Sequence, residues 1–481
     1  MADVFVSQKL AHSEVTPQIT NSFSTTRLRE EYIRLYQGLR DQSDPVTWRT
    51  TICKIKMLLG VNCPDWDMLP NNKHKEAVEL VNKLVFGTYL ESFTPDLLQA
   101  LGLNSHKHTR EVIDALIYNG RHLPEELLWK VANEYQNQNK SVVVVNPVGH
   151  YNDGETRIVA PGKLTNDVRR LIILASTQEM YGGSVAVLAN VIRTIRFAPF
   201  SRSIKTVDVV VPMFGGSRSD KDGQSPEIGF EVQQAIFDAK MLSATTADLL
   251  QSLREELSLN DVPQVRFFSI DIHGGTFPQR IFESDGLEFV SICPMPAFAE
   301  AVKQEMIDQK LENLPLMVVA SDAGATVRAE RFAHEISKIN DKSEILMVYF
   351  DKKRSQAGEV GRLAVAKLAH WSTIGSSITK KDINDAKIVG ERFVRIIPDD
   401  MLDTGGTAEK DSELLDQIMP TSALKIFIAT HPVLSRGPLA VDRTKADVVL
   451  VGNTLNPPHL KSHSKVRVIN LARSIVNALE F

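Results

Sequence analysis

The sequence predicts an α/β protein with two consecutive parallel-sheet domains behind a helical N-terminal region. From Ser141 onward, short runs of apolar and β-branched residues recur, and each is followed by a turn and a helical pattern. Continuous apolar strands that alternate with helices are typical of parallel sheets covered on both faces. The ten runs are Val142–Val145, Leu171–Leu174, Val207–Val211, Val265–Ile270, Leu316–Val319, Ile345–Phe350, Val394–Ile397, Ile426–Ile428, Val448–Val451 and Val466–Ile469.

Because ten strands are more than one sheet commonly holds, we expect two α/β domains, residues 141–292 and 293–481, divided near Cys293. Residues 1–140 differ, since they are rich in Leu, Glu, Lys, Asn and Gln and carry apolar residues at helical spacing. These helical patterns are Leu28–Leu39, Thr51–Leu59, Lys75–Val85 and Leu127–Tyr135. We therefore predict a helical accessory domain over residues 1–140, in which no motif indicates a role.

The composition is that of an ordinary globular protein. The 481 residues are 43% hydrophobic and 24% charged, with a net charge of −4, so no overall basic surface for nucleic acid is expected. Three scattered cysteines do not form a disulfide framework or a zinc site and fit a reduced compartment. The sequence shows neither a signal-peptide pattern nor an apolar run near the ~20 residues that span a bilayer. We expect a cytoplasmic protein with no membrane partner.

The clearest chemical motif follows the apolar run Phe393–Ile397. Asp399 and Asp400 stand at its carboxyl end, and a small-residue turn, Thr404-Gly405-Gly406-Thr407, should open a helix. Such a turn points backbone N–H groups outward and lets a phosphate approach closely. The acids cannot hold phosphate, but they can hold ribose hydroxyls or a hydrated divalent cation. The stretch therefore predicts a sugar-phosphate site.

Four other predicted strands also end in polar motifs, and ligands of parallel sheets bind beyond such ends. A Gly-rich turn with Arg218 follows Val207–Val211 and suits a nucleotide phosphate. Asp271-Ile-His273 follows Val265–Ile270 and suits a cation or a phosphate. The other two strands lead to Asp322 and to the cationic cluster Asp351-Lys352-Lys353-Arg354, which suits a polyphosphate. Together the strand ends predict a site for a magnesium polyphosphate and a sugar phosphate.

These motifs occur in the same order and at similar intervals as in the ribose-phosphate pyrophosphokinase family, which makes phosphoribosyl pyrophosphate (PRPP), and residues 141–481 resemble that family. The resemblance implies two tandem domains of the type I phosphoribosyltransferase fold. It also implies Mg²⁺-dependent transfer of the pyrophosphoryl group of ATP to the anomeric hydroxyl of ribose 5-phosphate, giving PRPP and AMP. The expected assembly is a homo-oligomer, either dimer-based or a hexamer.

The resemblance also implies roles for individual residues on the nucleotide side. Tyr151, Asp153 and Glu155 are similar to an aromatic-x-Asp-Gly-Glu segment that reaches the adenine site of a neighbouring subunit. Arg218 and Asp220 lie in a segment that resembles the ATP loop. These five residues are the expected ATP-binding set.

The expected catalytic and metal residues come from three further motifs. His273 belongs to an Asp-x-His motif whose histidine lies at the magnesium–ATP site, and Asp322 resembles an aspartate that serves magnesium and the ribose. Lys352 and Arg354 resemble the flexible catalytic loop. The resemblance thus implies that His273, Lys352 and Arg354 are catalytic and that His273 and Asp322 hold the metal.

The ribose 5-phosphate loop corresponds to residues 399–407, and an arginine one turn into the helix after Asp322 completes the set. The expected ribose-phosphate-binding residues are Arg328, Asp399, Asp400, Asp403, Thr404, Gly405, Gly406 and Thr407. Thr430-His431 and Gly452-Asn453-Thr454 are similar to two further segments of the family and receive no role here. The family's first strand and helix are not recognisable before Ser141.

Other interpretations stay open. One is a pyrophosphokinase that acts on a larger ribose such as ADP-ribose, and another is a non-catalytic regulatory paralogue. The intact Asp271, His273, Lys352 and Arg354 argue against the paralogue. A phosphoribosyltransferase that consumes PRPP would share only the loop of residues 399–407.

Overall fold

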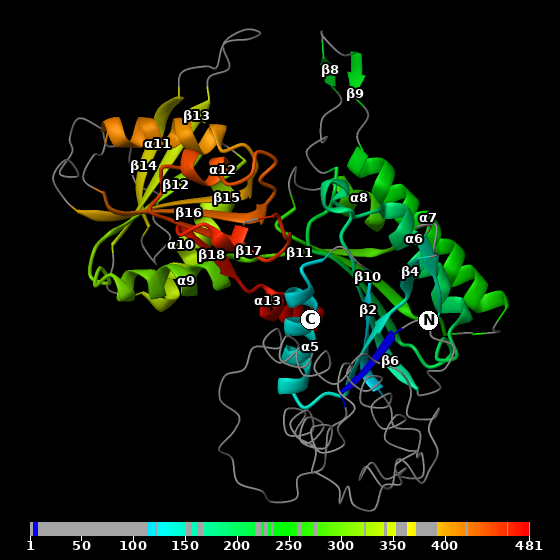
Figure 1. Cartoon of the computed structure of the whole chain (residues 1–481). Coiled ribbons are helices and arrows are strands. Elements are labelled where there is room, and N and C mark those ends of the chain that lie inside the picture. Colours follow the sequence, from blue (N-terminus) through cyan, green and yellow to red (C-terminus); the bar gives the residue numbers. More distant parts are fainter. Residues whose placement is uncertain are drawn as a thin grey trace, which may run out of the picture.

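The computed structural model describes residues 3–7, 113–120, 123–150, 156–160, 167–216, 223–225, 229–231, 234–256, 259, 261–272, 277–321, 324–340, 344–352, 363–371, 392–418, 422–458 and 460–480. Within them, two seven-stranded sheets stand side by side (Figure 1). Each sheet has six parallel strands and one antiparallel edge strand, so the predicted α/β class with two parallel sheets is confirmed. No helix in this part of the chain is long and apolar enough to cross a membrane.

The first sheet has the strand order β1-β3-β2-β6-β7-β10-β11. Its strands are β1 (Asp3–Ser7), β2 (Ile113–Asn119), β3 (Val142–Asn146), β6 (Val168–Leu174), β7 (Thr206–Val211), β10 (Gln264–Ile270) and β11 (Glu288–Ile292). One face packs on α6 (Val185–Arg193), α7 (Gln234–Glu255) and α8 (Phe277–Ser284), and the other packs on α5 (Glu125–Asn137). Two hairpins, β4–β5 (Val148–His150, Thr156–Ile158) and β8–β9 (Gly223–Ser225, Gly229–Glu231), complete this half.

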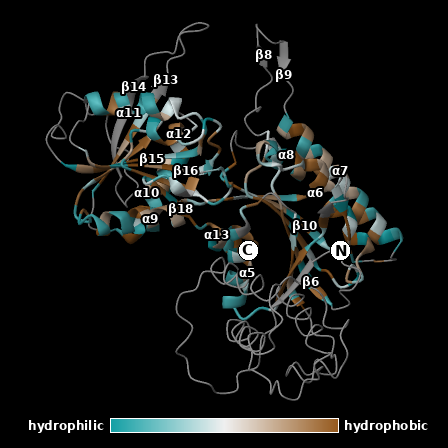
Figure 2. Cartoon of the chain, viewed as in Figure 1, coloured by the Kyte–Doolittle hydropathy of each residue, from teal (hydrophilic) through white to brown (hydrophobic). Residues whose placement is uncertain are grey.

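The second sheet has the order β14-β13-β12-β15-β16-β17-β18. Its strands are β12 (Leu316–Ala320), β13 (Ile345–Lys352), β14 (Leu363–Trp371), β15 (Phe393–Leu402), β16 (Ser422–Pro432), β17 (Val448–Gly452) and β18 (Val466–Ile469). One face packs on α9 (Met295–Asp308) and α10 (Thr326–Ile339), and the other on α11 (Gly406–Ile418) and α12 (Leu439–Arg443). The last helix, α13 (Ala472–Leu479), packs beside α5 and β11 of the first half. In Figure 2 the hydrophobic colour gathers on the strands and the hydrophilic colour on the outer faces of the helices.

All ten predicted runs form strands, but the first sheet begins earlier than the sequence indicated. Strand β2 and helix α5 lie within residues 1–140, which were expected to form a separate helical domain, and β2 pairs in parallel with both β3 and β6. The expected boundary at residue 140 therefore falls inside the first α/β unit. Of the four helical patterns in this region, Leu127–Tyr135 lies in α5, and the other three lie outside the described residues.

The C-terminal helix joins the two halves. Ile475 and Val476 of α13 are buried in the same apolar cluster as Ile172 of the first sheet and Val318 of the second. Beside this cluster, the buried Arg266 of β10 donates to Asp208 at 2.8 Å and to the carbonyl of residue 479 at 2.8 Å. The end of α13 is thus fastened to the first sheet by apolar packing and by the hydrogen bond from Arg266, whose guanidinium also pairs with Asp208.

Candidate active site

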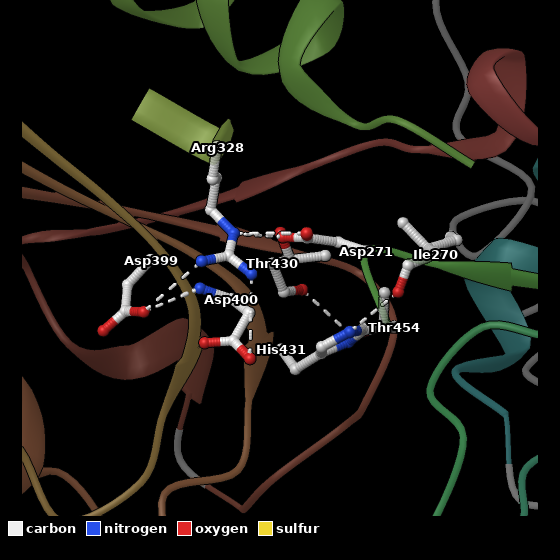
Figure 3. Close-up of polar contacts among 8 residues, drawn as sticks. All are labelled: Ile270, Asp271, Arg328, Asp399, Asp400, Thr430, His431 and Thr454. Carbon is white, nitrogen blue, oxygen red and sulfur yellow. Dashed lines mark hydrogen bonds and ion pairs between the residues drawn. The ribbon is translucent and has the colours of Figure 1, made fainter. Parts of the chain in front are cut away.

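The carboxyl ends of strands from both sheets meet at one place, which Figure 3 shows in close-up. β10 ends in Ile270 and Asp271, β15 carries Asp399 and Asp400, and β16 carries Thr430 and His431. Two further side chains reach this place, Arg328 from the first turn of α10 and Thr454 from the turn after β17. Because β10 belongs to the first sheet and the others to the second, the site lies where the two halves touch.

The guanidinium of Arg328 lies among three carboxylates. Its Nε is 2.9 and 3.1 Å from the two oxygens of Asp271, and its terminal nitrogens are 3.9 Å from Asp399 and 3.8 Å from Asp400. Burial opposes the charge of Arg328, but the carboxylates of Asp271, Asp400 and Asp399 more than offset it and raise the pKa of the guanidinium. Arg328 is therefore a permanent cation between the two halves.

Asp399 and Asp400 form a close pair of acids. The backbone N–H of Asp400 donates to the Asp399 carboxylate at 2.9 Å. Burial raises the pKa of Asp399 well above its usual value, and the neighbouring Asp400 carboxylate raises it further, while Arg328 works in the opposite direction. Two acids this close hold a proton more readily than an isolated aspartate, and they offer oxygen atoms to a sugar hydroxyl or a hydrated cation.

The small-residue turn lies where the sequence predicted it, between β15 and α11. Gly405 has a φ of +75°, and a Cβ at this position would lie 2.5 Å from the carbonyl oxygen of Ala440. The residue must therefore be glycine for two reasons, backbone conformation and the close approach of α12. Helix α11 begins at Gly406, and the first N–H groups of a helix have no carbonyl partner one turn earlier, so they are available to an anion.

Two neighbours fix the shape of this turn. The Asp403 carboxylate accepts a hydrogen bond from the backbone N–H of Ser435 at 3.2 Å. Arg443 of α12 donates to the carbonyl of Thr404 at 3.3 Å. Asp403 and Thr404 thus help to hold the turn on the loop after β16 and on α12.

His431 is a buried residue to which the sequence gave no role. Its Nε2 lies 3.0 Å from the carbonyl oxygen of Ile270, which can only accept, so Nε2 carries the hydrogen. Its Nδ1 lies 2.9 Å from the Thr454 hydroxyl, which also lies 3.1 Å from the carbonyl oxygen of Thr430. Burial lowers the pKa of His431, in keeping with a neutral ring. The adjacent Thr430 donates to the Asp271 carboxylate at 2.7 Å. The sequence signals for these residues are their positions at the ends of β16 and β17 and their similarity to two segments of the ribose-phosphate pyrophosphokinase family.

Several expected site residues lie outside the described residues. They are Tyr151, Asp153, Glu155, Arg218, Asp220, His273, Asp322 and Arg354. Lys352 is the last residue of β13, where its backbone pairs with Leu363 of β14. The strands that lead to His273 and Asp322 end at Ile270 and Ala320, one on each side of the junction. Among the described residues alone, no group of three or more His, Cys, Asp or Glu is arranged to hold a metal ion.

Comparison with known proteins gives a consistent result. The chain is 27% identical over 341 residues to the ribose-phosphate pyrophosphokinase of Shewanella oneidensis, which covers 69% of this chain and 85% of that protein. It is 23% identical over 372 residues to the enzyme of the same description from Buchnera aphidicola, covering 76% and 95%. The chain is a distant homologue of the ribose-phosphate pyrophosphokinases. No family model matches it.

A solved structure supports the fold. The phosphoribosylpyrophosphate synthetase of Mycobacterium smegmatis superimposes with a TM-score of 0.52 at 19% identity, covering 76% of this chain and 98% of that one. At this identity the likeness shows the architecture alone. It agrees with two parallel sheets in tandem.

Proposed function

We propose that the protein transfers the β,γ-pyrophosphoryl group of ATP to the anomeric hydroxyl of ribose 5-phosphate, giving PRPP and AMP. The observation that carries this proposal is the position of the small-residue turn of residues 404–407. It follows the acid pair Asp399 and Asp400, which lies across the junction from Asp271, two residues before His273. A sugar-phosphate site and the motif expected to serve ATP are therefore adjacent.

In this proposal each half of the protein binds one substrate. The first N–H groups of α11 and the hydroxyls of Thr404 and Thr407 bind the 5-phosphate, and the oxygens of Asp399 and Asp400 accept from the ribose hydroxyls. Arg328 neutralises part of the charge of these acids. Tyr151, Asp153, Glu155, Arg218 and Asp220 are the proposed contacts to ATP, those from 151–155 serving a neighbouring subunit, which requires at least a dimer.

The reaction needs positioning and charge stabilisation rather than a covalent intermediate. The anomeric hydroxyl releases its proton to solvent as its oxygen attacks the β-phosphorus, the bond from that phosphorus to the α–β bridging oxygen breaks, and AMP leaves with the bridging oxygen. Lys352 and Arg354 stabilise the negative charge that develops on the phosphoryl oxygens. His273 and Asp322 are the proposed ligands of Mg²⁺, which when bound neutralises part of the polyphosphate charge. Carboxylate oxygen is the donor type that this ion prefers.

The packing of α12 favours ribose 5-phosphate over a larger acceptor. A Cβ on Gly405 would touch the backbone of Ala440, and Arg443 bonds the carbonyl of Thr404. α12 therefore closes one side of the turn. An acceptor that continues beyond its 5-phosphate would need free space on that side.

The test compares acceptors on one preparation with Mg-ATP. We expect AMP as the nucleotide product, and a kcat/KM for ribose 5-phosphate at least about tenfold higher than for ADP-ribose, which corresponds to ~1.4 kcal/mol of transition-state binding. A ratio of that size in favour of ADP-ribose would identify ADP-ribose as the acceptor and leave the proposed reaction type unchanged. The absence of AMP formation with either acceptor would contradict the proposed function itself.

A further inference from the structure

Two buried side chains at the end of β16 bind the end of β10. The hydroxyl of Thr430 donates to the Asp271 carboxylate at 2.7 Å, and the Nε2 of His431 donates to the carbonyl of Ile270 at 3.0 Å. Thr430 is 0% exposed and His431 is 2% exposed. We propose that Thr430 and His431 are positioning residues, which fix the segment that leads from β10 to His273 against the ribose-phosphate half of the site. We refer to these two hydrogen bonds as the inter-sheet contact.

The surroundings of His431 exclude a direct role in binding a substrate. Its Nδ1 contacts the Thr454 hydroxyl and its Nε2 donates to the backbone of β10, so both ring nitrogens face protein groups. The ring is buried and neutral, and it therefore acts as a fixed donor. Its function is to join the two sheets.

The backbone of Asp271 indicates that this strand end is held in a defined shape. Its φ is +44°, in the left-handed region that residues other than glycine seldom adopt. Its N–H bonds the carbonyl of Ile292 at 3.0 Å, and its carboxylate accepts from both Arg328 and Thr430. A backbone of this kind persists where the surrounding contacts determine it. Contacts from β11 and from the second half together therefore set the direction in which the chain leaves β10.

Other contacts hold β10 and its surroundings against the same half. Near its amino end, Arg266 bonds the carbonyl of Leu479 at the end of α13. Beside the inter-sheet contact, Met213 and Tyr181 of the first half pack in one apolar cluster with Val433, Met401 and Leu455 of the second, and the hydroxyl of Tyr181 donates to the carbonyl of Val433. The strand is thus fixed at both ends, and the inter-sheet contact is the fixation point next to the site.

The effect on the rate rests on the proposed function. In that reaction ATP and the sugar phosphate are bound by opposite halves, so each substrate can bind while the two halves are slightly displaced. Attack of the anomeric oxygen on the β-phosphorus needs the two substrates in register, and a displacement of ~1 Å can cost on the order of 10²-fold in rate. Loss of the inter-sheet contact should therefore lower kcat and leave both KM values nearly unchanged.

The experiment uses the full chain and paired variants. Thr430→Val removes the hydroxyl at constant shape, and Thr430→Ser keeps it. His431→Leu removes the donor, and His431→Gln supplies an amide N–H near the position of Nε2. We expect kcat to fall about 10–100-fold in the Val and Leu variants, and the Ser and Gln variants to recover a large part of the loss.

Two matched controls test for general damage to the fold. Thr246→Val removes a buried hydroxyl that bonds Leu242 within α7, and His463→Gln alters a histidine that faces Asp442. Neither contacts the junction, so both should keep the wild-type kcat. A KM for one substrate that rises at constant kcat in the Thr430 or His431 variants would show a substrate contact and overturn the proposal.

Hydrogen exchange separates failure of this proposal from failure of the proposed function. Peptides that cover residues 264–272 should exchange about tenfold faster in Thr430→Val and His431→Leu than in the controls, whatever reaction the protein catalyses. If the wild type forms no AMP, the proposed function fails and exchange alone decides whether the contact holds β10. Unchanged exchange at residues 264–272, or faster exchange with an unchanged kcat, would overturn the positioning role.

Discussion

The Nε of Arg328 lies 2.9 and 3.1 Å from the two carboxylate oxygens of Asp271, so an arginine of the second half is bound by an acid of the first. The side chains of both are largely buried, with 13% and 14% exposed. The sequence placed Arg328 among the ribose-phosphate ligands. In the structure its closest partner is Asp271, and Asp399 and Asp400 lie 3.8–3.9 Å away. We therefore propose that it serves the sugar through these acids.

Replacement of Arg328 by Met should destabilise the protein. The change leaves the carboxylates of Asp271, Asp399 and Asp400 without their shared cation, and breaking a buried ion pair costs about 3–5 kcal/mol. The measurement is the free energy of unfolding in urea. Arg193→Met is the matched control, because Arg193 pairs with Asp248 on the surface, where such a pair contributes about 0–1 kcal/mol. Equal losses of unfolding free energy in the two variants would contradict the role of Arg328 as the buried cation shared by three carboxylates.

The stability of the wild type relative to His431→Gln should depend on pH. Burial lowers the pKa of His431 in the folded state, against the opposing charges of Asp271 and Asp400. As pH falls below ~6.5, His431 binds a proton in the unfolded chain but not yet in the folded protein. The stability that His431 contributes is therefore complete above that pH and is lost as pH falls toward its lowered value. Urea unfolding of both proteins from pH 8 to pH 5 checks this, and a pH-independent difference would show that the ring is not buried neutral.

A comparison of two glycines distinguishes the effect of backbone conformation from that of close packing at the turn of residues 404–407. Gly405 and Gly286 both have a φ of +75°, but a Cβ on Gly405 would lie 2.5 Å from the carbonyl of Ala440, whereas nothing lies within 4 Å of one on Gly286. Gly286→Ala should cost only the backbone strain, about 1–2 kcal/mol. Gly405→Ala should cost more and should also raise the KM for the sugar phosphate, because α12 must move. Thermal unfolding and initial-rate kinetics check both changes, and equal effects would disprove the steric role of α12.

Lys352→Ala and Arg354→Ala test the assignment of the cationic cluster. If these residues stabilise charge in the transition state, kcat should fall about 10²–10³-fold with little change in the KM for ATP. Steady-state kinetics over a range of ATP concentrations gives both values. A raised KM at constant kcat would make them binding residues instead.

The sequence predicted the regular part of the fold well. All ten apolar runs form strands, because parallel strands buried on both faces must be continuously apolar. Among the parallel strands it missed β2, whose run Ile113–Asn119 contains Asp114 and Asn119, and β11, which alternates at the sheet edge. Both are weaker apolar patterns than the central strands. Because β2 was missed, the first α/β unit was started at residue 141.

The site was predicted in part. The turn of residues 404–407 and the acids at positions 399 and 400 were readable because strand, turn and helix are local. The pairing of Arg328 with Asp271 spans 57 residues, and the bond from His431 to Ile270 spans 161. Contacts of that kind depend on how the two sheets meet, and no spacing in the sequence encodes it. Thr430 and His431 therefore carried no role until the structure placed them.

The identity of the nucleotide product tests the proposed pyrophosphoryl transfer most directly. The full chain is incubated with Mg-ATP and ribose 5-phosphate, and AMP, ADP and the phosphorylated sugar are separated and counted. We expect AMP, formed one-for-one with a pyrophosphorylated sugar, and a strong loss of both products in Asp399→Asn. ADP as the product, or no Mg²⁺-dependent turnover with any ribose phosphate, would contradict it.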